Sequence, residues 1–165
     1  MNNLSCCLRA IITMLMVAGG LVHAASGGPL PEIKTPKASA AESMQRINPE
    51  ELARIIQSLQ GEKPLLLHVG FHVLYVQAHI PGSEYVGPAS KEEGMRQLRQ
   101  RMKSLSRKKF IVIYCGCCPW EHCPNVHPAY RELRAMGFEN VKVLYLANNF
   151  GTDWTRKGYP IAKGE

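Results

Sequence analysis

Short apolar runs alternate with helical patterns along most of this chain, and that alternation limits the folds open to it. Apolar runs that predict strands cover 64–69, 110–114 and 141–146, with a short extended piece at 85–86. Helical patterns cover 49–61, 91–105 and 125–136. Strands that alternate with helices form a parallel sheet covered on both faces. We therefore predict the α/β class, a small parallel β-sheet flanked by helices on both faces, with 110–114 as its central strand.

Local signals set the ends and the inner faces of the predicted helices. Asn48 is expected to cap the first helix, with Pro49 at its first position, and Gly61 is expected to end it. Gly137 should end the third helix in the same way. Trp154 is predicted to lie in the core. The side chains expected to point inward are Leu52, Ile55, Ile56 and Leu59 in the first helix, and Met95, Leu98 and Met102 in the second.

The first 45 residues differ in composition from the rest of the chain. Arg9 is the only basic side chain among the first nine residues, 10–22 is almost wholly apolar, and Ala24 fits the last position before a cleavage site. We predict that 1–24 is a signal peptide, removed together with Cys6 and Cys7, that 25–45 is a flexible leader, and that 46–165 is a single domain. The expected product is exported, either periplasmic or secreted, without stable membrane insertion after cleavage.

The charge of the chain limits the classes of partner that it is expected to bind. Lys and Arg number 20 against 13 Asp and Glu, which gives a formal charge of +7. The basic side chains are spread along the chain rather than interleaved with aromatic residues, and the densest run, 99–109, fits a solvated helix face and its exit turn. We therefore expect no nucleic-acid partner, whereas the positive excess would attract a small anion.

Four of the six cysteines fall within nine residues, directly after the apolar run 110–114. They are Cys115, Cys117, Cys118 and Cys123. A loop between a strand and the next helix directs backbone N–H groups and the positive helix end toward one point, which stabilises a thiolate. Ligands of parallel sheets also bind beyond the carboxyl ends of the strands, where this loop begins. The pattern predicts sulfur chemistry, with Cys115 as the thiolate at the strand end.

Several short segments follow one another along the chain in a recognisable order. They are Ile47-Asn48-Pro49-Glu50-Glu51-Leu52, the strand at 65–69, His79-Ile80-Pro81-Gly82-Ser83, Ile111-Val112-Ile113-Tyr114-Cys115, 129–138, and Trp154 with Gly158-Tyr159-Pro160. Together these segments resemble a single rhodanese domain. The resemblance extends from about residue 46 to the end of the chain. It implies a small sulfurtransferase fold in which a cysteine accepts sulfane sulfur as a persulfide and passes it on. By position, that cysteine is Cys115.

The chain departs from this family in two places. His68-Val69-Gly70 stands where family members usually have Asp-Val-Arg, so the usual acid and base are both absent. The active loop is longer and rich in cysteine, and Glu121 occupies the place where a cysteine-phosphatase relative would carry arginine. The second departure argues against hydrolysis of phosphate esters.

A mechanism can be assigned to the loop residues. Cys115 would be the nucleophile, His122 or His127 would supply a nearby positive charge or a proton, and His68 could replace the missing acid. A persulfide on Cys115 could then be attacked by a resolving thiol, either Cys117, Cys118 or Cys123. The expected partner is a small sulfur-containing anion, thiosulfate or polysulfide, or a thiol protein. The remaining predicted loop and pocket residues are Gly116, Pro119 and Trp120.

Three alternatives remain open from the sequence. Cys115 and Cys118 form a Cys-x-x-Cys pair, the spacing that thiol-disulfide oxidoreductases use. Cys117, Cys118, Cys123 and His122 offer soft ligands for Cu(I) or Zn(II), although their spacing is not that of separated zinc-binding arms. Third, the cysteines could form structural disulfides, or the scaffold could bind a partner without catalysis. No cofactor is expected.

Overall fold

The structure is a computed structural model that describes residues 44–165. Its centre is one five-stranded sheet with all strands parallel, in the order β1-β5-β4-β2-β3. The strands are β1 (Arg46–Ile47), β2 (Leu65–His68), β3 (Glu84–Tyr85), β4 (Ile111–Tyr114) and β5 (Val141–Leu144). β4 is the central strand, paired with β2 on one side and β5 on the other. The parallel α/β fold predicted from the sequence is confirmed.

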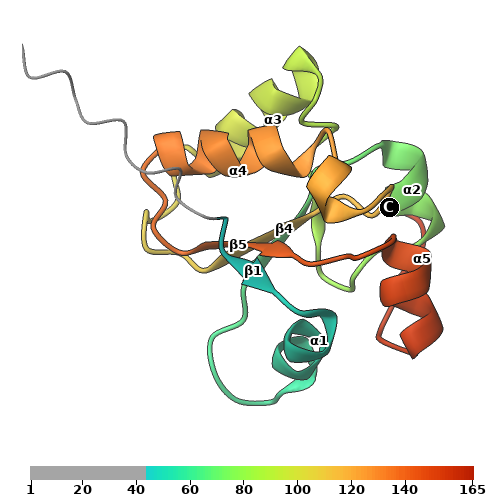
Figure 1. The fold of residues 1–165 in the computed structure, drawn as a ribbon. Helices are drawn as coiled ribbons and strands as arrows, with labels where there is room; N and C mark the ends of the chain where they lie inside the picture. The colour runs from blue at the N-terminus through green and yellow to red at the C-terminus, as the bar shows by residue number, and fades with distance from the viewer. Residues whose placement is uncertain (1–43) are drawn as a thin grey trace, which may run out of the picture. The chain divides into compact units, whose positions relative to one another are not determined.

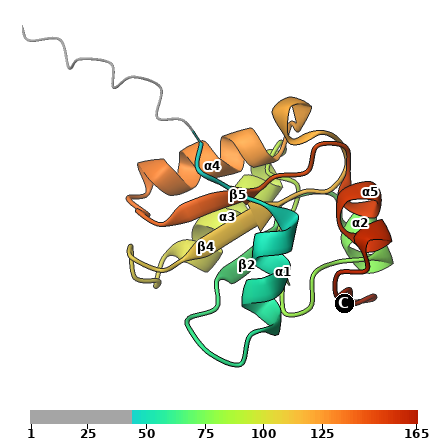
Figure 2. The same ribbon diagram turned by 60° about the horizontal axis from the view of Figure 1, so that its bottom comes forward.

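Helices cover both faces of this sheet (Figures 1 and 2). They are α1 (Pro49–Gln57), α2 (His72–Gln77), α3 (Glu92–Met102), α4 (Val126–Ala135) and α5 (Phe150–Asp153), with 3-10 turns at Trp120–His122 and Thr155–Lys157. α3 and α4 pack on one face, and α1 and α5 pack on the other. α2 and α5 lie side by side in both views.

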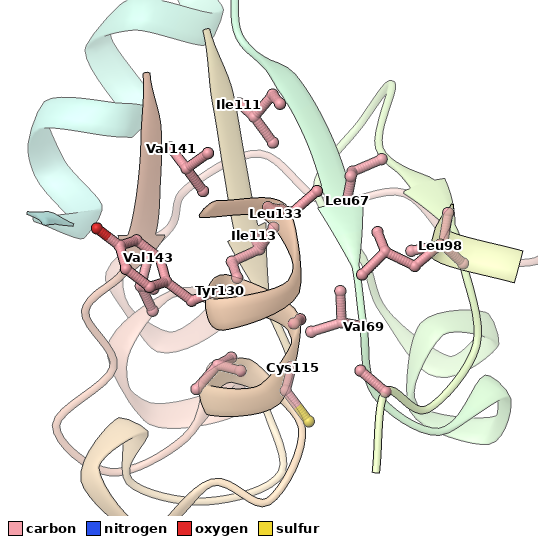
Figure 3. Close-up of a cluster of buried hydrophobic side chains, with 14 of the residues drawn as sticks. Leu67, Val69, Leu98, Ile111, Ile113, Cys115, Tyr130, Leu133, Val141 and Val143 are labelled. Carbon is pink, nitrogen blue, oxygen red and sulfur yellow. The ribbon is translucent and has the colours of Figure 1, made fainter. Parts of the chain in front are cut away.

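The central strand alternates between the two cores. Ile111, Ile113 and Cys115 belong to the core under α3 and α4, whereas Val112 and Tyr114 belong to the core under α1 and α5. Successive side chains of a strand point to opposite faces, so Cys115 continues the alternation beyond the end of β4. Figure 3 shows its sulfur at the end of the row that begins with Ile111. The alternation therefore directs the Cys115 side chain toward the α4 face.

The strand order also selects the place where a ligand site forms. From β2 the chain moves outward to β3 and then returns across β2 to β4, so the direction of winding reverses between β2 and β4. Crevices in parallel sheets open at such a reversal, beyond the carboxyl ends of the two strands. β2 ends at His68, and Cys115 directly follows β4. These two residues therefore lie on either side of the crevice.

Most predicted elements are present, with shorter bounds. The first helix ends at Gln57 rather than near Gly61, because Ser58 adopts an extended conformation. The prediction that Leu59 points inward is wrong, since this side chain lies beyond the helix and is fully exposed. Asn48 occupies the N-cap position of α1, but its side chain makes no capping hydrogen bond. The predicted burial of Trp154 and of the inner face of α3 is confirmed.

The sequence pattern missed three elements, β1, α2 and α5. Each spans six residues or fewer, which is too short for a helical or strand period to be recognised. The predicted signal peptide, 1–24, and residues 25–43 of the predicted leader lie outside the described residues. Within 44–165, none of the helices has the length and apolar character that crossing a bilayer requires.

Candidate active site

A cavity of about 530 Å³ opens at the carboxyl ends of β2 and β4. Cys115 and His68 contribute to its wall from the strand ends, and Phe150 contributes from α5. Its other lining residues are Leu74, Gln77, Ala78, Gly116, Cys117, Asn149, Gly151, Thr155, Ile161 and Lys163. Only 2% of Cys115 is exposed, yet the cavity reaches it, so a small molecule in the cavity can contact a sulfur that bulk solvent barely touches.

The four loop cysteines are free thiols gathered in one cluster. Cys117 Sγ is the common contact, at 3.3 Å from Cys115 Sγ, 2.9 Å from Cys118 Sγ and 3.9 Å from Cys123 Sγ. The sulfurs of Cys115, Cys117 and Cys123 all lie within 4.8 Å of one another. The resolving role predicted for Cys117, Cys118 or Cys123 requires a thiol close to Cys115, and these distances allow it. The nearest sulfur to Cys115 belongs to Cys117. Cys118, the partner of Cys115 in the Cys-x-x-Cys spacing, contacts Cys117 instead.

Asn125 holds the nucleophile from the other side. It is fully buried, and its Nδ2 donates a hydrogen bond to Cys115 Sγ over 3.3 Å. Its Oδ1 accepts a hydrogen bond from the Ser90 backbone N–H at 3.0 Å, which ties the loop before α3 to the site. Asn125 occupies the N-cap position of α4, at the start of the helix expected over 125–136, but its side chain makes no capping bond. Sequence reasoning therefore placed this residue correctly and missed its contact with the thiol.

Two glycines leave the room that the Cys115 loop needs. A Cβ on Gly70 would lie 2.6 Å from Cys115 Sγ, which is closer than any ordinary contact. Gly116 has a positive φ of 84°, and a Cβ there would lie 2.8 Å from Phe150 Cβ. The Gly116 carbonyl also accepts a hydrogen bond from the Phe150 N–H, which fixes α5 against the loop. The glycine that replaces the family arginine at position 70 is thus a steric requirement of this site.

The negative charge of the cluster settles on Cys123 rather than Cys115. The pKa of Cys123 is lowered to about 5, first by its interaction with the Cys115 thiol and then by the N–H groups of Val126 and Asn125 at the start of α4. The same interaction with Cys123, together with burial, raises the pKa of Cys115. The helix end expected to ionise Cys115 acts on its neighbour instead. In the resting cluster Cys115 is a protonated thiol close to a thiolate.

His68 is a neutral, buried part of the site. Desolvation lowers its pKa to about 4. Its Nδ1 accepts a hydrogen bond from the Gly70 N–H at 3.3 Å, and the ring hydrogen-bonds the Cys115 carbonyl. Because the ring acts as an acceptor toward Gly70 and as a donor toward Cys115, it braces both strand ends. His68 therefore lies where the sequence predicted a bracing residue, but it carries no charge at neutral pH.

The other predicted loop residues lie away from the main cavity. Trp120 packs against His127, with Arg46 above its ring, and shares a small cavity with Cys115, Cys118 and Cys123. His127 Nε2 lies 3.0 Å from the Trp120 carbonyl, so this ring supports the loop rather than the nucleophile. His122 is exposed and lies outside the compact group of thiols, and Pro119 precedes the 3-10 turn. Neither histidine is placed to exchange a proton with Cys115.

The C-terminal segment completes the cavity, and sequence reasoning did not assign it to the site. His79 and Ala162 form an antiparallel bridge through two backbone hydrogen bonds, of 3.0 and 2.8 Å. This bridge places Ile161 and Lys163 on the cavity wall. Trp154 anchors the same segment by donating from Nε1 to the Pro160 carbonyl at 2.8 Å. The only sequence signal was the Trp and Gly-Tyr-Pro pieces of the family resemblance.

Comparison with known proteins agrees with this geometry. The family model described as the rhodanese-like domain matches residues 48–146. No curated protein matches the chain closely enough to count as a relative.

Solved structures show the same fold at low identity. The crystal structure of the Alr3790 protein from Anabaena sp. is 20% identical, with a TM-score of 0.54 over 72% of this chain and 92% of that one. The BH2092 protein from Bacillus halodurans is 22% identical, with a TM-score of 0.54 over 72% of this chain and 77% of that one. Since the family model covers more than half of the chain and the fold agrees, this chain belongs to the rhodanese-like domain family.

Proposed function

We propose that this protein is a sulfurtransferase that carries sulfane sulfur as a persulfide on Cys115 and releases it through Cys117. The single observation that carries the proposal is the position of Cys115 Sγ, which lines the cavity at the reversal point of the sheet and lies 3.3 Å from Cys117 Sγ. A nucleophile at a strand end and a second thiol within contact distance are the two parts that uptake and release of sulfur require.

The first step loads sulfur. Cys115 attacks the sulfane sulfur of thiosulfate, the sulfur–sulfur bond of the donor breaks, and sulfite leaves with the bonding electrons. The proton of Cys115 passes to the Cys123 sulfur, which lies within 4.8 Å. Asn125 Nδ2 donates to the Cys115 sulfur and offsets its developing charge. The product is a persulfide on Cys115.

The second step releases sulfur. The Cys117 sulfur attacks Cys115 Sγ, a disulfide forms between the two residues, and hydrosulfide leaves with the terminal sulfur. An external dithiol must then reduce this disulfide before the next cycle. Cyanide or an acceptor thiol can instead remove the terminal sulfur directly, in which case Cys117 is not oxidised.

Mass spectrometry of single variants tests the proposal. After exposure to thiosulfate or polysulfide, the Cys117→Ser variant should retain one added sulfur atom on Cys115, because its resolving thiol is absent. The wild-type protein should pass through the same adduct and finish as a Cys115–Cys117 disulfide with release of sulfide. Sulfur uptake that persists unchanged in Cys115→Ser, or no uptake in Cys117→Ser, would disprove it.

A further inference from the structure

The compact thiol group suggests a second use that does not depend on sulfur transfer. We propose that Cys115, Cys117 and Cys123 form a three-coordinate site for Cu(I). Their sulfurs lie within 4.8 Å of one another, with 3.3 Å and 3.9 Å from Cys117 to the other two. The set differs from the ligands expected from the sequence, because Cys115 joins it while Cys118 and His122 lie outside it.

The donor set selects the metal. All three ligands are thiols, and soft sulfur ligands without carboxylate or imidazole favour Cu(I). Structural zinc sites are almost always tetrahedral with four ligands. Cys118 is the remaining thiol in the loop, and it is not among the sulfurs that lie within 4.8 Å of one another, so the gathered set lacks a fourth ligand. A trigonal Cu(I) site needs only the three thiols already gathered.

The surroundings of the thiols suit such an ion. Cys115 and Cys123 are buried, and Val126, Leu144 and Leu146 line the small cavity beside them, so water is largely excluded. N–H groups surround the sulfurs, one from Asn125 Nδ2 to Cys115 and others from the start of α4 to Cys123. Such donors offset the negative charge of metal-bound thiolates and hold the ligands in place.

The route to the site is also present. Cys117 is half-buried, and both it and Cys115 line the large cavity. An ion can therefore reach the group from the cavity, and each ligand that is still protonated loses its proton to solvent when it binds. Since Cys115 would be a ligand, bound Cu(I) should also block sulfur loading at that residue.

Titration of the full chain with Cu(I) tests the proposal. Every protein in the series carries Cys6→Ser and Cys7→Ser, so that only the four loop cysteines remain. The reduced protein is titrated without oxygen against a coloured Cu(I) chelator, and without any sulfur donor. We expect one Cu(I) per chain and an X-ray absorption spectrum of three sulfur ligands. Cys123→Ser should weaken binding by more than about 100-fold, since losing a ligand costs more than losing a supporting residue.

Cys118→Ser is the matched control, because the Cys118 thiol contacts the group but is not a ligand. This variant should keep the Cu(I) affinity and the three-sulfur spectrum of the parent protein. If Cys123→Ser does not fold, Cys117→Ser, at a half-buried position, should show the same loss. Equal weakening by Cys118→Ser and Cys123→Ser, four sulfur ligands, or Zn(II) binding that outcompetes Cu(I) would overturn the proposal. Because no sulfur donor is present, these results are independent of the persulfide experiment.

Discussion

The groups that hold Cys115 in place are a glycine, a buried amide and a neutral imidazole rather than an ion pair. Gly70 makes room for its sulfur, Asn125 donates to it, and His68 hydrogen-bonds its carbonyl. In the family pattern an acid and a base brace this region, and this chain has neither. A buried neutral ring and a glycine give the same positional restraint without a charge that burial would penalise.

Gly70→Ala should disturb the nucleophile directly. The new Cβ would lie 2.6 Å from Cys115 Sγ, and crowding of this kind in a packed interior costs about 1–3 kcal/mol. We expect a lower free energy of unfolding in urea and slower sulfur uptake. In a Cys115→Ala background, where the sulfur is absent, the same change should cost at least about 1 kcal/mol less. If Gly70→Ala lowers the free energy of unfolding equally in both backgrounds, the new methyl group does not clash with the Cys115 sulfur.

His68 should make stability depend on pH. Burial lowers its folded-state pKa to about 4, while the unfolded chain keeps a value near 6.5. Below pH 6.5 the unfolded state therefore binds the proton more readily, and stability falls as the pH drops toward 4. The full loss is roughly 3 kcal/mol. Urea unfolding at pH 7 and pH 4.5 measures most of this loss.

The controls for this pH dependence are two other variants. His68→Asn cannot take up a proton at this position, so its unfolding free energy should vary less between the two pH values. His122→Gln changes an exposed ring and should keep the wild-type dependence. If His68→Asn keeps the full pH dependence, the proton is taken up elsewhere.

Among the elements, β4 and α4 together define the chemistry of the loop between them. β4 delivers Cys115 on the α4 face, and the first N–H groups of α4 bond Cys123. The loop is long enough to fold back, so a thiol eight residues after the nucleophile returns to its side. The strand thus positions the nucleophile, while the helix stabilises the thiolate.

The start of α4 should hold one thiolate at mildly acidic pH. The pKa of Cys123 is lowered to about 5 by the Cys115 thiol and by the N–H groups of Val126 and Asn125. The ultraviolet absorbance of thiolate, followed with pH in the reduced metal-free protein, should show one step near pH 5. Cys123→Ser should remove that step, and Cys118→Ser should retain it. A first thiolate that forms only above about pH 8 would contradict this assignment.

Across the whole domain, the site depends on segments that are distant in sequence. The ends of β2 and β4, helices α2 and α5, and the C-terminal segment all line one cavity. The bridge between His79 and Ala162 joins the last residues of the chain to the segment after α2. The domain therefore needs its final residues to enclose the cavity.

Lys163, in the C-terminal segment, should help the cavity to bind anionic sulfur donors such as thiosulfate. Among the described residues that line the cavity, Lys163 has the only basic side chain apart from the neutral His68. Lys163→Gln should raise the thiosulfate concentration for half-maximal sulfur uptake roughly twofold to fivefold, as expected for an exposed charge worth up to about 1 kcal/mol. The increase should shrink at high salt. Lys157→Gln, at a position outside this cavity, serves as the control, and an equal effect there would indicate general charge attraction.

The sequence was sufficient for the fold and for the thiol loop, because both depend on local patterns. The apolar run before Cys115 and the helical periods around it predicted a parallel sheet, and the four cysteines after β4 predicted sulfur chemistry in this loop. Short elements without a full period, such as α2 and α5, escaped this reasoning.

Tertiary packing decided which thiol ionises and which residues face the nucleophile. The thiolate lies on Cys123 because the Cys115 thiol, and after it the N–H groups of Val126 and Asn125, lower its pKa, and Asn125 reaches Cys115 only because the loop folds back. Hydrogen-bond direction, burial and contact between remote segments depend on coordinates in space, which spacing along the chain does not specify. For the same reason Lys163 joins the cavity only once the last residues pair with His79.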